Sequence, residues 1–251
     1  MMTCTQTDTD KVVEDILKAT GAWQEGHFLL TSGKHSNQYM QCQILLQYPR
    51  LGNYLADLLI SKLLHQGILP EVVVGPAMGA IHWEVFVAQS LERCLLQNPD
   101  LRNSSNRESD HHTLSTSASG QEYFLTHDTI NDAIAGTRLP DFIKAVFAEK
   151  IVGTSDFELR RGIELNPGQK VLVVEDVTTT GGSVRRVLDL LNSLRCDPVA
   201  VGAIVDRSGS RISYDAPFVK LLTVDLATYD KKECPMCKAG SQVIKPGSST
   251  I

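Results

Sequence analysis

The sequence predicts an α/β fold in which helices cover both faces of a parallel sheet. Runs dominated by apolar residues at 72–75, 170–174 and 199–205 are typical of parallel strands that are buried on both faces. Helix-like patterns, with apolar residues three and four positions apart, stand between these runs. Strands that alternate with helices in this way form a parallel sheet through right-handed connections.

The first half of the chain is expected to hold three helices and one strand of the sheet. A helix over residues 10–20 places Val12, Val13, Ile16 and Leu17 on one face. Residues 26–44 alternate irregularly around a turn at residues 31–33, which predicts short strand-like pieces. A helix over residues 54–66 stops at a glycine, and the strand at 72–75 and a helix at 81–96 follow.

The second half of the chain continues the alternation. The strongest strand, at 170–174, follows a turn of the Asn-Pro-Gly type, and a strand is also expected at 145–148. A helix over residues 183–194 turns Val184, Val187, Leu188 and Leu191 inward. Further strands are predicted at 199–205 and 218–224. Residues 97–144 form a polar insertion, with few large apolar residues over 97–121, and are expected to lie at the surface.

Composition and charge exclude several classes of function. The 251 residues carry 24 basic and 29 acidic side chains, a net charge of −5, which argues against binding nucleic acid through a general positive field. No apolar stretch approaches the length of a membrane span. The first residues have neither a basic nor an apolar segment of a signal peptide, so we expect a cytoplasmic protein.

The Cys234 and Cys237 pair is the one suggestive cysteine spacing among six cysteines. A structural zinc site needs four ligands, and the sequence offers neither a second such pair nor a nearby pair of histidines. We therefore interpret the pair as structural or incidental, with a metal or redox role as the less favoured alternative. No metal-ligating residues are assigned.

The chemistry-bearing segment runs from a strand through two carboxylates and a turn into a helix. The turn of small residues leads to a helix N-terminus, where free backbone N–H groups and the helix dipole can hold a phosphate. Carboxylates one step away can accept hydrogen bonds from the vicinal hydroxyls of a sugar. The segment therefore predicts a ribose 5-phosphate site; the simpler alternative is a helix cap beside a solvated strand end. Its residues are Glu175, Asp176, Val177, Thr178, Thr179, Thr180, Gly181, Gly182 and Ser183.

This segment resembles the phosphoribosyl-pyrophosphate (PRPP) motif of the type I phosphoribosyltransferases. The orotate phosphoribosyltransferases, in their longer bacterial form, are the most similar branch. That assignment depends on a combination of segments at residues 26–36, 74–80, 160–162, 206–209 and 228–248. The resemblance implies one domain over residues 1–251. Its sheet core would carry a hood made of about residues 1–45 and the C-terminal segment.

The resemblance also implies an activity and roles for individual residues. The family transfers phosphoribose from PRPP to orotate with Mg²⁺, which gives orotidine 5′-monophosphate and pyrophosphate in pyrimidine (UMP) biosynthesis. Glu175 and Asp176 would hold the ribose hydroxyls, with Asp176 counted as catalytic, and residues 178–183 would hold the 5′-phosphate. The loop at 76–80, with Ala77 and Gly79, would lie beside the pyrophosphate. Arg207 would contact orotate, and Lys34 would lie in the hood over the base.

An arginine suits orotate on chemical grounds as well, because a guanidinium can pair with a planar carboxylate through two hydrogen bonds. A surface salt bridge is the plainer alternative for Arg207. Breaking the C1′–O bond builds negative charge on the pyrophosphate, so cations aimed at the leaving group would assist catalysis. Mg²⁺ prefers phosphate oxygens and water, so no strong metal motif is expected.

The sequence departs from the family pattern in the loop that would close over the site. The corresponding residues 148–162 contain Lys150, Arg160 and Arg161 but no histidine, and we assign these three cations to the leaving group. A lysine common beside the pyrophosphate loop is also missing. Two alternatives stay open: a phosphoribosyltransferase for another base, and a non-catalytic PRPP-binding regulatory protein. The resemblance implies a homodimer that binds neither nucleic acid nor membranes.

Overall fold

A six-stranded sheet forms the centre of the computed structural model, which describes residues 6–30, 32–98, 101 and 142–246. The strand order is β5-β4-β3-β6-β7-β8, and all neighbours are parallel except β5, which runs antiparallel to β4. This confirms the predicted fold class. Most of the expected insertion at 97–144 lies outside the described residues.

The elements of the sheet domain follow the predicted alternation. The strands are β3 (Val72–Pro76), β4 (Lys144–Lys150), β5 (Phe157–Glu158), β6 (Lys170–Thr178), β7 (Asp197–Asp206) and β8 (Phe218–Thr223). The helices are α1 (Gln6–Ala19), α2 (Cys42–Leu46), α3 (Pro49–His65), α4 (Ile81–Gln97) and α7 (Gly182–Ser193). None of the described helices is both long and apolar enough to cross a membrane.

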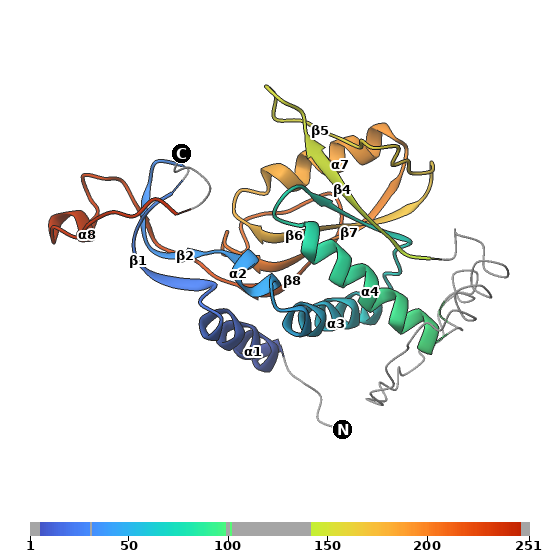
Figure 1. Cartoon of the computed structure of the whole chain (residues 1–251), viewed down its shortest axis with the longest axis horizontal. Coiled ribbons are helices and arrows are strands. Elements are labelled where there is room, and N and C mark those ends of the chain that lie inside the picture. The colour runs from blue at the N-terminus through green and yellow to red at the C-terminus, as the bar shows by residue number, and fades with distance from the viewer. Residues whose placement is uncertain (1–5, 31, 99–100, 102–141, 247–251) are drawn as a thin grey trace.

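Helices cover both faces of the sheet, with α3 and α4 on one face and α7 on the other (Figure 1). Alternate residues of a strand point to opposite faces, and the buried residues follow this rule. Val73 and Leu172 belong to the core cluster that contains α1, α3 and α4. Val72 and Val171 belong to the cluster that contains α7. Continuous apolar runs in the sequence therefore reflect strands that are buried on both sides.

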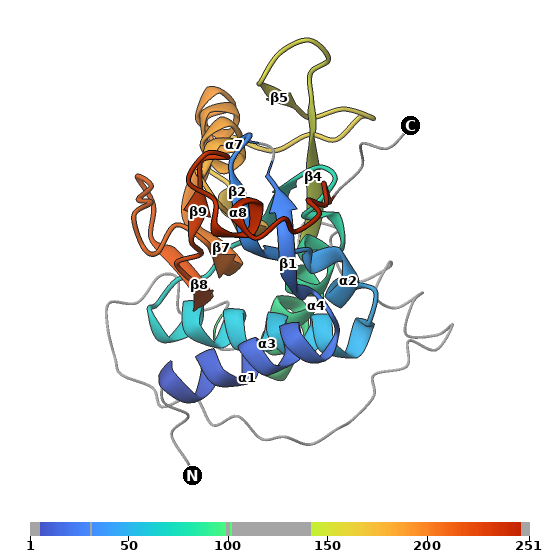
Figure 2. The same cartoon turned by 90° about the vertical axis from the view of Figure 1, so that its left-hand side faces the viewer.

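A second, smaller sheet forms the hood to one side of the domain (Figures 1 and 2). It consists of β1 (Trp23–Leu29), β2 (His35–Met40) and β9 (Thr228–Tyr229), with the short helix α8 (Pro235–Lys238) beside it. The C-terminal tail lies along β1, because Leu29 N–H donates to the Ile244 carbonyl over 2.8 Å. The C-terminal part of the described chain therefore pairs with the hood, whereas α1 packs in the main core.

The structure corrects several expected boundaries. Val13 of α1 and Leu45 of α2, which lie within the range expected for the hood, are fully buried in the main core. Helix α3 begins at Pro49 rather than at residue 54, since proline is tolerated in the first turn of a helix. Strand β6 continues to Thr178 because it keeps its pairing with β7 as far as Asp206. The short elements α2, β5, β9 and α8 were not predicted, because so few residues carry no periodic pattern.

Candidate active site

Three loops that the sequence predicts for the site meet at one edge of the sheet. They follow β3, β6 and β7, which are neighbours in the strand order and run parallel. Ligands of open α/β sheets bind outside this carboxyl edge. The last pair between β3 and β6 is Val74 with Val173, whereas β6 runs on beside β7 to Thr178. The final residues of β6 therefore border the loop after β3.

The turn between β6 and α7 has the geometry of a phosphate cradle. Gly181 adopts a left-handed conformation with φ of 73° immediately before the helix begins at Gly182. A Cβ at Gly181 would lie 2.7 Å from the Tyr214 hydroxyl oxygen, so no larger residue fits there. Thr179, Thr180, Gly182 and Ser183 are exposed. Their backbone and hydroxyl donors are thus accessible to an anion at the start of the helix.

Thr178 and Arg185 support this cradle. Thr178 is buried, and its hydroxyl donates to the Val205 carbonyl over 3.3 Å, so that donor is already used within the sheet. Arg185 donates to the Thr180 carbonyl over 2.8 Å and to the Ser213 carbonyl over 3.3 Å. The structure therefore brings together residues 178–183, which are predicted to bind the phosphate, and Thr178 is the end of this segment that is fixed in the sheet. Arg185 was missed, since its sequence position indicates only an exposed helix residue.

Glu175 and Asp176 form a pair of adjacent carboxyl groups inside strand β6. Burial raises the pKa of Glu175 well above its usual value, and the neighbouring Asp176 raises it further. Burial also raises the pKa of Asp176, while a hydrogen bond from the Val177 backbone N–H, 2.8 Å from Oδ1, works in the other direction. Such perturbed carboxyl groups gather at functional sites.

The loop after β3 approaches the same carboxylate. A Cβ at Gly79 would lie 3.2 Å from Asp176 Oδ1, so the glycine keeps open the space beside that oxygen. The Ala77 N–H donates to the Ala148 carbonyl of β4 over 2.8 Å, which fixes the start of the loop. The predicted neighbours Ala77, Gly79 and Asp176 are thus brought together.

Arg207 directly follows β7, and its charge acts on Tyr39 and Cys42, which Asp176 also influences. Burial lowers the pKa of Arg207, and the charged forms of Tyr39 and Cys42 counteract this. Burial raises the pKa of Cys42, and both Asp176 and Glu175 add to the increase. Nε of Arg207 is buried and has no hydrogen-bond partner among the described residues. A half-buried cation with an unused donor is suited to an anionic ligand.

The backbone on either side of Arg207 is held firmly. Its N–H donates to the Thr178 carbonyl over 2.8 Å. The preceding Asp206 is fully buried and accepts hydrogen bonds from Ser208 N–H, the Ser208 hydroxyl and Lys220 Nζ at 2.8, 2.6 and 3.2 Å. The bonds from Ser208 and Lys220 outweigh burial and lower the pKa of Asp206. Asp206 therefore positions Arg207 without facing the ligand itself.

A relay of side chains that the sequence analysis missed joins Tyr39 of β2 to the loop after β3. The Tyr39 hydroxyl donates to Gln41 over 3.0 Å, Gln41 donates to Gln43 over 2.8 Å, and Gln43 donates to the Gly79 carbonyl over 2.8 Å. The only signal in the sequence is polar residues at alternate positions after β2, which also occurs on ordinary exposed strands. The relay therefore connects the end of β2 to the loop after β3 through three hydrogen bonds.

The predicted cationic loop lies apart from the carboxylate pair. Lys150 ends β4, and the hairpin of β4 and β5 projects beyond the sheet (Figures 1 and 2). Arg161 donates to both carboxylate oxygens of Glu149 at 2.8 and 3.3 Å, and Arg160 donates to Glu158 over 2.6 Å. In this conformation the two arginines bind glutamates of their own hairpin. The leaving-group role of these cations remains a prediction.

Lys34 also lies away from the carboxylate pair. It follows the turn between β1 and β2, and its Nζ lies 4.0 Å from Asp230 Oδ1, with both side chains about half exposed or more. A pair at this distance and exposure holds the lysine loosely. Lys34 therefore lies in the β1–β2 hairpin, and its contact with the base remains a prediction.

Glu84 is a buried carboxyl beneath the loop after β3 that the sequence analysis did not single out. It is 1% exposed, and its Oε2 has no hydrogen-bond partner among the described residues. Burial raises the pKa of Glu84 from 4.5 to about 8, while a backbone hydrogen bond from Gly75 acts against this. The group is therefore protonated in the folded protein at neutral pH and charged in the unfolded chain.

Replacing Glu84 with glutamine should stabilise the protein at alkaline pH. Because the folded pKa is raised, the stabilisation is complete below about pH 4.5 and is lost as pH rises to about 8. Each pH unit in that window costs about 1.4 kcal/mol of unfolding free energy, and the variant escapes this loss. Urea unfolding from pH 5 to 9 measures the difference, with exposed Glu25→Gln as control. Parallel curves for Glu84→Gln and the natural protein would contradict the assignment.

The comparisons with known proteins agree with this geometry. The family model described as "Phosphoribosyl transferase domain" matches residues 43–235. This range includes the loops after β3, β6 and β7. The chain belongs to this family. The matched region begins in α2 and leaves out strands β1 and β2 of the hood.

Several curated members of the family are similar to the chain over nearly its full length. Orotate phosphoribosyltransferase of Thermotoga maritima is 36% identical over 237 residues, which covers 94% of this chain and 98% of the relative. The protein of the same name from Thermoanaerobacter sp. is 36% identical over 236 residues, with 94% and 96% covered.

Solved structures share the fold at lower identity. Orotate phosphoribosyltransferase from Aeropyrum pernix has a TM-score of 0.50 at 21% identity, covering 84% of this chain and 93% of that one. Leishmania donovani UMP synthase has a TM-score of 0.53 at 14% identity, covering 87% of this chain and 37% of the longer one. These likenesses confirm the predicted architecture.

Proposed function

We propose that the protein is an orotate phosphoribosyltransferase, which transfers phosphoribose from PRPP to orotate in pyrimidine biosynthesis. The observation that carries the proposal is the half-buried Arg207 guanidinium, whose Nε has no partner among the described residues, at the same edge of the sheet as a carboxylate pair and a phosphate cradle. The relatives named above carry this activity in their names. An adenine or guanine substrate has no carboxylate for such an arginine to bind.

Different residues of the site would bind different parts of the substrate. Thr179 to Ser183 would bind the 5′-phosphate, and Glu175 with Asp176 would accept hydrogen bonds from the ribose hydroxyls. The C1′–O bond to the diphosphate breaks, and a bond from C1′ to N1 of orotate forms. The ribose gains positive charge in this step, which the Asp176 carboxylate opposite Gly79 would stabilise. The products are orotidine 5′-monophosphate and pyrophosphate.

Mg²⁺ would fit beside the carboxylate pair. Gly79 keeps clear the space next to Asp176 Oδ1, and a cation there would favour the charged forms of two carboxyl groups whose pKa burial raises. Oxygen donors are what Mg²⁺ prefers, and most of them would come from the substrate and from water. Bound there, Mg²⁺ would neutralise charge on the diphosphate. Asp176 and Glu175 are the residues that would hold it.

Orotate depletion, followed by ultraviolet absorbance, tests the proposal. We expect turnover with purified protein that requires both PRPP and Mg²⁺ and stops when EDTA is added in excess. Adenine, guanine and uracil in place of orotate are the controls for the base. A protein that PRPP stabilises against heat but that turns over no base would instead be the non-catalytic PRPP-binding protein. Absence of both turnover and stabilisation would contradict the PRPP site itself.

Removing Arg161 should lower kcat by about 10²-fold or more, because it removes a cation from the leaving group in the closed state. Glu149→Gln is the matched variant: it breaks the same ion pair but keeps the cation, so kcat should not fall. Initial rates at saturating PRPP and orotate measure both. If Arg161→Ala turns over at the natural rate, the leaving-group role is wrong.

We also propose a cytoplasmic homodimer, and the same variant tests whether its two chains share their loops. The hairpin of β4 and β5 projects away from its own sheet, so a partner's site is within its reach only if two chains associate. Mixing and reassembling Arg161→Ala with Asp176→Asn chains would place one intact loop on one intact site. About a quarter of the natural turnover should return in a two-fold dimer. A mixture that stays inactive would contradict sharing.

A further inference from the structure

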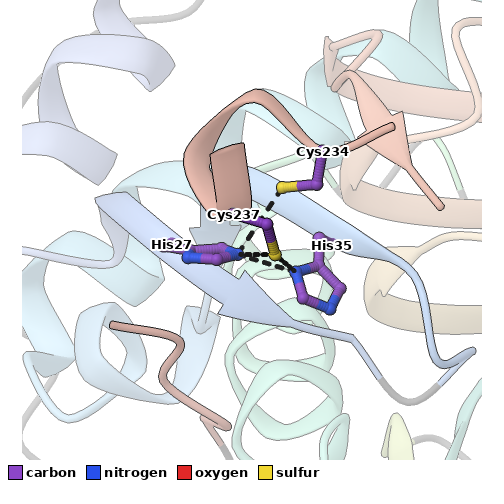
Figure 3. A group of neighbouring side chains, drawn as sticks. All are labelled: His27, His35, Cys234 and Cys237. Carbon is purple, nitrogen blue, oxygen red and sulfur yellow. Dashed lines mark hydrogen bonds between the residues drawn. The ribbon is translucent and has the colours of Figure 1, made fainter. Parts of the chain in front are cut away.

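Four side chains of types that can bind a metal ion gather in the hood (Figure 3). His27 comes from β1, His35 from β2, and Cys234 and Cys237 from the segment that begins α8. Their ligand atoms all lie within 4.8 Å of one another. The sequence analysis found no histidines near the cysteine pair, because 207 residues separate His27 from Cys234. We propose that these residues bind one structural Zn²⁺ ion.

Three nitrogen–sulfur distances in the cluster agree with a tetrahedral site. A zinc ion bound to two nitrogens and two sulfurs at ordinary bond lengths sets each nitrogen about 3.5 Å from each sulfur. His27 Nε2 lies 3.5 Å from Cys234 Sγ and 3.6 Å from Cys237 Sγ, and His35 Nδ1 lies 3.4 Å from Cys237 Sγ. The two nitrogens are 2.6 Å apart and need to separate by less than 1 Å, to about 3.3 Å.

The surroundings of His27 prepare its Nε2 as a ligand. Its Nδ1 lies 2.9 Å from the Ser241 carbonyl, which can only accept, so Nδ1 carries the proton and the lone pair is on Nε2. A carbonyl behind a zinc-bound histidine is the usual arrangement of a metal site. The strand also helps, because the register shifts between Glu25 and Phe28. This irregularity lets His27 and Phe28 both be buried although they are adjacent.

The cluster is closed rather than catalytic. His27, His35 and Cys234 are 3%, 4% and 0% exposed, and Cys237 is partly buried. Four protein ligands leave no position for water or substrate, which is the pattern of structural zinc. Two thiolates with two imidazoles in a tetrahedron favour zinc over the harder divalent cations. Without an ion, two imidazoles and two thiols would meet in the interior with few hydrogen bonds to satisfy them.

The ion would fasten the two ends of the chain together. The hood has three strands, one of them only two residues long, so its own pairing is limited. Zinc would join the β1–β2 hairpin to the segment after β9 and so hold the hood together. Binding energy of this kind adds directly to the stability of the folded state.

Metal analysis of tag-free protein, purified under reducing conditions with added Zn²⁺ and then dialysed, tests the proposal. We expect about one zinc per chain in the natural protein and below about a tenth in Cys237→Ser, which loses one of four ligands. Cys94→Ser on α4 is the matched control and should keep its zinc. Chelation should lower the melting temperature of the natural protein by about 5 °C or more and leave Cys237→Ser unchanged.

Three results would overturn the proposal. The first is natural protein that stays free of zinc after loading, and the second is a Cys237→Ser variant that retains as much zinc as the control. The third is a disulfide between Cys234 and Cys237 in the zinc-loaded protein, seen as a loss of two hydrogens by mass. If Cys237→Ser does not fold, Co²⁺ titration of the natural protein replaces it. Visible bands of a tetrahedral cobalt–thiolate site are expected, and their absence would contradict the site.

Discussion

Asp176→Asn should lower turnover by about 10²- to 10³-fold while leaving the protein at least as stable as the natural one. The loss follows because the carboxylate is the group placed to stabilise positive charge on the ribose, and such electrostatic groups have effects of this size. Asparagine can still accept the hydrogen bond from Val177. Initial rates with PRPP and orotate measure the loss of turnover.

Stability separates a functional role of Asp176 from a structural one. Burial raises the pKa of Asp176, so the folded state loses stability as pH rises through that shifted pKa, and the asparagine variant does not. The melting temperature of Asp176→Asn at pH 8 should therefore equal or exceed the natural value. Asp197→Asn, exposed at the opposite end of strand β7, is the control and should change neither quantity. Turnover within threefold of the natural rate would contradict the assignment.

Arg207→Met should cost about 10²-fold in kcat/KM for orotate, because charged hydrogen bonds to a carboxylate contribute about 1.5–3 kcal/mol each. Uracil lacks the carboxylate, so the preference for orotate over uracil should shrink by a similar factor. PRPP should still stabilise the variant against heat, since the phosphate cradle and the carboxylate pair are unchanged. Steady-state kinetics with both bases and melting curves with PRPP measure these effects.

Arg211→Met is the matched control for Arg207. Arg211 lies four residues further along the chain, is exposed, and donates to both carboxylate oxygens of Asp225 at 3.0 and 2.9 Å. We expect it to alter neither base preference nor PRPP binding. If Arg207→Met weakened PRPP and orotate equally, Arg207 would contact the phosphoribosyl group rather than the base.

Local sequence patterns determined the sheet and the cradle. Val171 to Val174 are apolar at every position and the strands beside them at most positions, because both faces are covered, so length and composition alone identified them. The turn before α7 was equally local, since Gly181 has the left-handed conformation that favours glycine. Nearly every residue of the phosphate cradle lies within one short segment, which is why the sequence predicted the cradle.

Only the tertiary structure decided which distant residues meet. Tyr39, Gln43 and Glu84 stand beside the site because β2, α2 and α4 fold over the loop after β3, and no local pattern marks them. That Arg161 meets Glu149 likewise depends on how β4 and β5 pair.

The hood shows most clearly the difference between what local sequence patterns predict and what only the folded chain decides. Cys234 and Cys237 were visible in the sequence as a spaced pair, but the two histidines that complete their cluster come from strands at the other end of the chain. Ligand spacing in sequence reports only contacts within one segment. Contacts that close a loop of some 200 residues depend on how β1, β2 and β9 pair, and that pairing is a property of the folded chain.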